Sequence, residues 1–138
     1  MFKLKSEIQF DMAHYLSGYE GKCSNIHGHR YRVIAILKSD ELQEKGQERG
    51  MVMDFGIFKR ELKRIEIMFD HKLVIENNEE GRKMQCLLND FQVVLVDYRP
   101  TAEEMSRHIY KILKERNLPV YQVEVYETPS NSSMYMEE

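Results

Sequence analysis

The chain has 138 residues, the size of one ordinary domain, and a core of that size is expected to bury about two thirds of the surface of the unfolded chain. Its 20 basic and 23 acidic residues give a net charge of −3, so the basic excess that marks a nucleic-acid-binding protein is absent. These values predict a single domain over residues 1–138 with no nucleic-acid partner.

The first residues, MFKLKSEIQF, alternate apolar and polar side chains, unlike the continuous apolar stretch of a signal peptide. No later segment has enough consecutive apolar residues to cross a bilayer. We therefore expect a cytoplasmic protein with no membrane partner. In a reducing compartment the two cysteines, Cys23 and Cys86, are expected to be thiols rather than a disulfide.

Two segments near the N-terminus have the period-two pattern of strands with one buried face. In residues 2–14 the even positions are mostly apolar and end at His14. In residues 27–37 the odd positions carry two histidines and then four core-type side chains, namely His27, His29, Tyr31, Val33, Ala35 and Leu37. Between them lies YLSGYEGKCSN, a loop that is longer than a tight hairpin needs. Its length makes it a candidate functional loop.

Helical periodicity follows these strands. With Asp54 as the N-cap, residues 55–69 place four apolar side chains at helical spacing, namely Phe58, Leu62, Ile65 and Phe69. A second helix is expected in PTAEEMSRHIYKILKERN, where Thr101 and Glu104 fit a capping box and His108 falls on the solvated face. Between the two, EEGRKMQCLLND suits a short helix and VVLV a short strand.

The last part of the chain contains two more strand patterns, VYQVEVYE and SSMYM. Strands at both ends with helices between them predict an α+β domain with a mostly antiparallel sheet. Glu127 is unusual because it continues the otherwise apolar face of Val123 and Val125. Either the strand has reached solvent there, or the carboxylate meets paired N–H donors such as the amino-pyrimidinone edge of a pterin.

His14, His27 and His29 are expected to meet if the two N-terminal strands pair as antiparallel neighbours. Alternate residues of a strand point to the same side, so His-x-His offers two imidazoles to one ion. Three imidazoles with an open fourth position are a ligand set of catalytic zinc. Cys23 as a fourth ligand would instead close the site and make it structural, and both interpretations stay open at this point.

Two further segments contain side chains with reactive groups. Asp70 and His71 are adjacent in FDHKLV, at the end of the first predicted helix. There His71 either complements the helix dipole or passes protons while Asp70 orients its ring. Cys86, in MQCLLND, lies among apolar residues and is interpreted as a packing thiol.

Together these residues resemble the 6-pyruvoyl-tetrahydropterin synthase family, and within it the bacterial 6-carboxy-tetrahydropterin synthase branch of queuosine biosynthesis. The resemblance runs nearly end to end, through FDMAH, CSNIHGHRY, VMDF, FDHK, RPTAEE and VYET. The Cys-x-x-x-His-Gly-His spacing favours the carboxy-forming branch, because pyruvoyl-forming members usually place the cysteine farther ahead. Residues 76–99 are longer than in compact members, and Met134 stands where a smaller residue is common.

The resemblance implies the tunnelling fold, in which two helices cover one side of a four-stranded antiparallel sheet. Subunits of this fold join into an oligomeric barrel, commonly a hexamer of two trimers, with active sites between subunits. The resemblance also implies Zn²⁺ on His14, His27 and His29. The implied reaction converts 7,8-dihydroneopterin triphosphate to 6-carboxy-tetrahydropterin, acetaldehyde and triphosphate.

The resemblance further assigns roles to single residues. Cys23, Asp70 and His71 would be the catalytic proton-transfer groups. Glu127 would hold the pterin ring with help from two residues near the start of the second helix, Thr101 and Glu103. Four basic residues are candidates for the triphosphate: Lys22, Arg30, Lys72 and Arg99. Two alternatives remain, namely a pyruvoyl product formed by triphosphate elimination, and a non-catalytic pterin- or metal-binding protein of the same fold.

Overall fold

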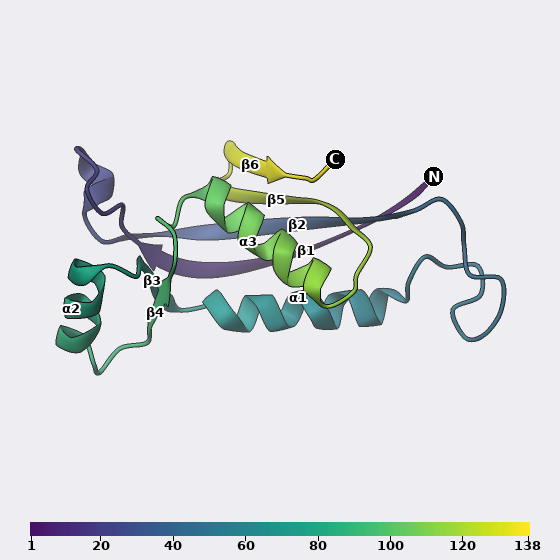
Figure 1. Ribbon diagram of the computed structural model, residues 1–138, viewed down its shortest axis with the longest axis horizontal. Coiled ribbons are helices and arrows are strands. Elements are labelled where there is room, and N and C mark those ends of the chain that lie inside the picture. Colours follow the sequence, from purple (N-terminus) through teal and green to yellow (C-terminus); the bar gives the residue numbers. More distant parts are fainter.

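The computed structural model describes all 138 residues. Its elements are β1 (Phe2–His14), the 3-10 turn η1 (Lys22–Ser24), β2 (His27–Ser39), α1 (Phe55–Phe69), β3 (Lys72–Glu76), α2 (Glu79–Leu87), β4 (Val93–Val96), α3 (Ala102–Glu115), β5 (Val120–Thr128) and β6 (Asn131–Tyr135). Figure 1 shows the long strands β1 and β2 running along the molecule, with η1, α2, β3 and β4 gathered at one end. None of the helices combines the length and apolar composition that a membrane-spanning helix needs.

The two strands predicted at the N-terminus are confirmed, and they pair antiparallel along their whole length. The register sets His14 opposite His27 and Met12 opposite His29. His14 and Met12 are buried, whereas the intervening Ala13 points to the other face and is more exposed. The pairing therefore brings all three histidines to the same end of the sheet.

The sheet differs from the expected four antiparallel strands, because it has six strands and is mixed. Its order is β4-β3-β1-β2-β5-β6, and β3 runs parallel to both β1 and β4. Strand β3 was not predicted, because KLVIE is a short apolar run without alternation and its partners are distant in the chain. The short helix α2 and short strand β4 occur where their patterns suggested, so the helices number three rather than two. The α+β class is confirmed.

One face of the sheet is covered by α1 and α3, which pack along β1 and β5 respectively (Figure 1). The Asp54 carboxylate caps α1 by accepting from the Gly56 amide at 2.6 Å, and the Thr101 hydroxyl caps α3 by accepting from the Glu104 amide at 3.2 Å. The inner faces of both helices are buried: Phe58, Leu62, Ile65 and Phe69 in α1, and Met105, Ile109 and Leu113 among others in α3. The long strands therefore keep one buried and one exposed face.

His108 is half-buried, which corrects the prediction of a solvated position. Its Nδ1 lies 2.6 Å from the Tyr98 hydroxyl, and its ring packs edge-on against Phe69. The periodicity of α3 does not reveal these neighbours, because they come from α1 and from the segment that follows β4. Burial lowers the pKa of His108 and raises the pKa of Tyr98, so a phenol donates to a neutral imidazole.

We expect the free energy of unfolding to fall as the pH drops below about 6.5, the ordinary pKa of a histidine in the unfolded chain. The folded pKa of His108 is lower, so on acidification the unfolded chain binds this proton first. Its contribution is complete above the unfolded pKa and is lost as the pH falls towards the folded one. Urea unfolding at several pH values should show a smaller loss in His108→Gln, which keeps an acceptor for Tyr98. Parallel pH profiles for wild type and variant would contradict this account.

Candidate active site

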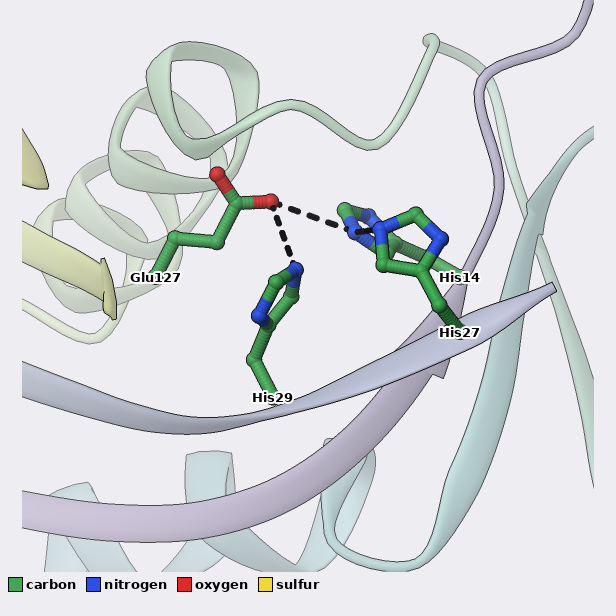
Figure 2. Close-up of side chains that lie close together, drawn as sticks. All are labelled: His14, His27, His29 and Glu127. Atoms are coloured by element: carbon green, nitrogen blue, oxygen red, sulfur yellow. Dashed lines mark hydrogen bonds and ion pairs between the residues drawn. The ribbon is translucent and has the colours of Figure 1, made fainter. Parts of the chain in front are cut away.

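The three histidines meet at one end of the sheet, together with Glu127. His14 Nε2 is 3.1 Å from His27 Nε2, and Glu127 Oε1 is 3.2 Å from His14 Nε2 and 3.3 Å from His29 Nε2. Figure 2 shows the four side chains directed towards a common centre from β1, β2 and β5. Their ligand atoms all lie within 4.8 Å of one another. We call this group the His/Glu cluster.

Backbone carbonyls hold the outer nitrogens of two of the rings. His14 Nδ1 donates to the Pro100 carbonyl at 2.8 Å, and His27 Nδ1 donates to the Asn25 carbonyl at 2.7 Å. Because a carbonyl can only accept, each Nδ1 carries the proton and each Nε2 presents a lone pair to the centre. Lone pairs and a carboxylate oxygen this close repel one another unless a positive charge lies between them. The donor set therefore fits a metal ion.

The spacing of the cluster agrees with a small tetrahedral ion. Nitrogen ligands at about 2.0–2.1 Å from zinc would lie roughly 3.3 Å from one another. The distance between the two Nε2 atoms of His14 and His27 is 3.1 Å. Little movement would be needed for these rings to share an ion.

The side of the cluster that faces the protein core is buried. His14 is 1% exposed, and the Tyr31 beneath it is fully buried, with its hydroxyl 3.3 Å from both nitrogens of His14. Burial lowers the pKa of His29, which favours the neutral imidazole that metal binding requires. The pKa of Glu127 is lowered as well, and its contact with His14 is the first of the causes that lower it. A cation at the centre would act on this carboxylate in the same direction.

Glu127 was predicted at the pterin ring, and the structure places it at the histidines. Its Oε1 faces the cluster, whereas Figure 2 shows the other oxygen directed away from the three rings. The residue also lines a cavity of about 320 Å³ with His29, Tyr126 and Thr128. One carboxylate can therefore approach an ion with one oxygen and a ligand with the other.

Cys23 lies in η1, near the cluster in sequence but outside it in space. The thiol is half-buried and free, and the fourth member of the cluster is Glu127. This geometry disfavours the closed structural site with Cys23 as the fourth ligand. Glu127 was not predicted as a cluster member, because its contacts join β5 to β1 and β2. A carboxylate on an apolar strand face was the only signal.

Asp70 and His71 form a second group at the end of α1. Asp70 Oδ1 is 3.0 Å from His71 Nδ1 and accepts from the Asp11 amide at 3.1 Å, and this backbone hydrogen bond is the main cause that lowers the pKa of Asp70. The His71 amide donates to the Asp11 carbonyl at 2.7 Å, and its φ of 59° is uncommon for a residue with a side chain. The His71 side chain is therefore accessible, at 76% exposed, and the Asp70 carboxylate fixes the orientation of its imidazole.

This second group is separate from the His/Glu cluster. Asp70 and His71 group with Asp11, and none of their ligand atoms belongs to the cluster. His71 lines a cavity of about 700 Å³ whose wall includes Asp11 and Arg30, and His29 of the cluster lines the same cavity. Alternation along β1 and β2 directs the side chains of Asp11 and Arg30 away from the face that carries His14. In one chain, the Asp70–His71 pair and the predicted metal ligand His14 therefore lie on different sides of the long strands.

The sequence profile of the family described as 6-pyruvoyl tetrahydropterin synthase matches residues 3–138. The chain belongs to this family. A protein of Haemophilus influenzae named 6-carboxy-5,6,7,8-tetrahydropterin synthase is 35% identical over 142 residues, which cover 99% of this chain and 100% of that protein. A protein of the same name from Synechocystis is 32% identical over 137 residues, with coverage of 98% and 93%.

Solved structures show the same fold at lower sequence identity. The 6-pyruvoyl tetrahydropterin synthase of Caenorhabditis elegans superimposes with a TM-score of 0.70 at 22% identity, over 99% of this chain and 96% of that one. A protein of Wolinella succinogenes superimposes with a TM-score of 0.78 at 22% identity, over 99% and 98%. These likenesses confirm the fold class of this 6-pyruvoyl tetrahydropterin synthase family member.

The other residues predicted for this family member lie around the two groups. Thr101 caps α3, next to the Pro100 carbonyl that holds His14, and Glu103 is exposed in the first turn of α3. The four basic candidates differ in their partners: Lys22 is exposed, Arg30 pairs with Asp11 at 3.1 Å, Lys72 donates to Gln92, and Arg99 donates to the Ser17 carbonyl. Cys86 is exposed rather than packed, because α2 buries only Gly81.

Proposed function

We propose that the protein converts 7,8-dihydroneopterin triphosphate to 6-carboxy-5,6,7,8-tetrahydropterin with release of acetaldehyde and triphosphate, as a cytoplasmic zinc-dependent lyase of queuosine biosynthesis. Relatives that carry the name of this synthase and align over nearly their whole length support the substrate and the product. One observation supports metal-dependent chemistry most directly. The imidazoles of the His/Glu cluster converge on one point, and backbone carbonyls fix Nδ1 of His14 and His27 so that each Nε2 lone pair faces that point. In this proposal residues 1–138 form one domain.

In this proposal His14, His27 and His29 hold one zinc ion through their Nε2 atoms. Bound zinc would polarise the side-chain oxygens of the substrate and acidify the adjacent C–H groups. The Cys23 thiol would exchange the proton of such a C–H group. His71 would exchange a proton through Nε2, because Asp70 engages its Nδ1.

Substrate recognition in this proposal begins with Glu127. The carboxylate oxygen that points away from the histidines is available to accept from the paired N–H groups of a pterin ring. Thr101 and Glu103 would assist from the start of α3. Arg30 and Lys72 remain candidates for the triphosphate, because both line the cavity beside His71.

We further propose that each active site forms between subunits of a homo-oligomer, in a barrel built as a hexamer of two trimers. The separation of the Asp70–His71 pair from the His/Glu cluster supports a shared site, since a second chain can supply the missing half. The strand order supports assembly as well. The edge strands β4 and β6 each leave a row of backbone groups free to pair with another chain.

Incubation of the purified protein with 7,8-dihydroneopterin triphosphate, followed by mass spectrometry of the products, tests the proposed reaction. We expect 6-carboxy-tetrahydropterin together with acetaldehyde. A 6-pyruvoyl product would assign the sister activity instead. Binding of the substrate without turnover would identify a non-catalytic pterin-binding protein.

A further inference from the structure

The hydrogen bonds that join the loop carrying Cys23, residues 15–26, to α2 and to the chain before α3 all involve one residue, Ser17. Both the backbone and the side chain of Ser17 are engaged: its carbonyl accepts from Arg99, and its hydroxyl contacts Asn78 and Glu80. Figure 1 shows η1 and α2 at the same end of the sheet. We call residues 15–26 the Cys23 loop.

Arg99 connects this loop to the metal ligands. Its guanidinium donates to the Ser17 carbonyl at 2.7 Å, and the carbonyl of the next residue, Pro100, accepts from His14 Nδ1 at 2.8 Å. Two consecutive residues thus hold the Cys23 loop and a histidine of the His/Glu cluster at the same time. This contact gives Arg99 a partner other than the triphosphate for which it was a candidate.

The contact at Ser17 is transmitted to Cys23 through the backbone. The amide of Leu16, the residue before Ser17, donates to the Cys23 carbonyl at 2.8 Å and closes the loop at its base. Within the loop, the Ser24 amide donates to the Gly21 carbonyl at 3.1 Å and completes the η1 turn. A displacement of Ser17 would therefore move the backbone that carries the thiol.

On the other side, the first turn of α2 holds the Ser17 hydroxyl. Asn78 caps α2 by accepting from the Gly81 amide at 2.7 Å, and its Nδ2 donates to Ser17 Oγ at 3.2 Å. Ser17 Oγ in turn donates to Glu80 Oε2 at 3.2 Å. A donor and an acceptor from α2 thus engage one hydroxyl, which fixes its orientation.

The position of α2 is itself constrained by Gly81. This residue is buried, and a Cβ atom there would lie 2.0 Å from the carbonyl oxygen of Glu76, at the end of β3. The close approach is possible only without a side chain. The end of β3 therefore sets where Asn78 and Glu80 stand relative to Ser17.

We propose that Arg99, the α2 N-cap Asn78 and the α2 residue Glu80 are positioning residues that set the location of Cys23 through Ser17. Residues 76–99, a segment that is longer than in compact family members, then have a specific role, because this segment supplies all three positioning residues. The catalytic consequence rests on the proposed function, in which Cys23 exchanges protons with the substrate. The placement of the Cys23 loop does not depend on that function.

The test compares Arg99→Met with Arg64→Met, a matched control that removes an exposed guanidinium of α1 whose only partner is Glu61. The alkylation rate of Cys23 by iodoacetamide is measured by peptide mass spectrometry, with the exposed Cys86 in the same chain as internal reference. We expect Arg99→Met to raise the rate for Cys23 relative to Cys86 by about tenfold, because the loop opens more often. Arg64→Met should leave the ratio unchanged.

Turnover distinguishes a positioning role from triphosphate binding. We expect Arg99→Met to lower kcat by about tenfold to a hundredfold with little change in KM, as misplacement of a reacting group does. Arg99→Lys, which retains a donor, should recover part of both readouts. A raised KM with an unchanged alkylation ratio would overturn the proposal and assign Arg99 to the substrate.

Ser17→Ala provides a second variant if Arg99→Met does not fold. It removes the hydroxyl contacts with Asn78 and Glu80 and leaves the carbonyl that Arg99 uses. We expect a smaller rise in the Cys23 alkylation ratio. An unchanged ratio in every variant that folds would overturn the proposal. If the wild type does not turn over the pterin, the proposed function fails. The alkylation ratios still decide whether the Ser17 contacts hold the Cys23 loop in place.

Discussion

Replacing His29 with alanine is expected to remove most of the bound zinc, with activity falling in proportion, whereas Cys23→Ala keeps about one zinc ion per chain. His29 Nε2 faces the centre of the His/Glu cluster, and the Cys23 thiol is not among its ligand atoms. Loss of an outer partner of a metal ligand lowers affinity by about tenfold to a hundredfold, and loss of a ligand should exceed this. Metal analysis after gel filtration measures the zinc content.

His71→Ala is the matched control for this experiment, since it removes a histidine that lies outside the cluster. It should retain zinc while activity is lost. Equal zinc loss in His29→Ala and Cys23→Ala would favour a closed structural site. Zinc loss in His71→Ala alone would place the ion at the second group.

Cys23→Ala and His71→Ala homo-oligomers are each expected to be nearly inactive, and co-refolding them together should restore activity. Loss of a positioned acid or base lowers rates by about a hundredfold to ten-thousandfold. In a random equal mixture, about one quarter of the interfaces would join an intact Cys23 of one chain to an intact His71 of its neighbour. Activity should therefore approach one quarter of the wild-type value, measured on mixed oligomers whose composition is confirmed by native mass spectrometry.

The control for this complementation is Cys23→Ala co-refolded with the Cys23→Ala/His71→Ala double variant. This mixture contains no intact Cys23, so its activity should stay at the level of the parents. If the mixture of single variants stays equally inactive, Cys23 and His71 act within one chain. The separation of the two groups would then have to close by movement within the subunit.

Local patterns predicted the part of the site that lies on two strands. The positions of His14, His27 and His29 follow from strand alternation, and one antiparallel pairing is enough to bring them together. The same reasoning predicted α1 and its buried stripe, because Asp54 and the spacing of apolar residues are both local signals. A repeating pattern of side chains in the sequence predicts structure well where the contacts behind it are between residues close in the chain.

Contacts between distant segments were less accessible from the sequence. Glu127 reaches the histidines because β5 pairs with β2, and β3 pairs in parallel with two strands across long connections. His108 is half-buried because Tyr98 lies over it, although its helical position suggests solvent. The position of the Cys23 loop depends on the hydrogen bond between Ser17 and Arg99, which lie 82 residues apart in the chain. Each of these features needs the tertiary fold before residue chemistry can be assigned.

The most direct test of the proposed zinc-dependent lyase is the yield of acetaldehyde per dihydroneopterin triphosphate consumed, measured for the intact oligomer before and after zinc removal and after zinc is restored. Acetaldehyde forms only if the substrate's side chain is cleaved, so its yield separates carboxy formation from simple loss of triphosphate. We predict about one acetaldehyde per substrate with zinc, almost none after chelation, and recovery when zinc is added back. Triphosphate release without acetaldehyde, or turnover that is unchanged without zinc, would contradict the proposed reaction.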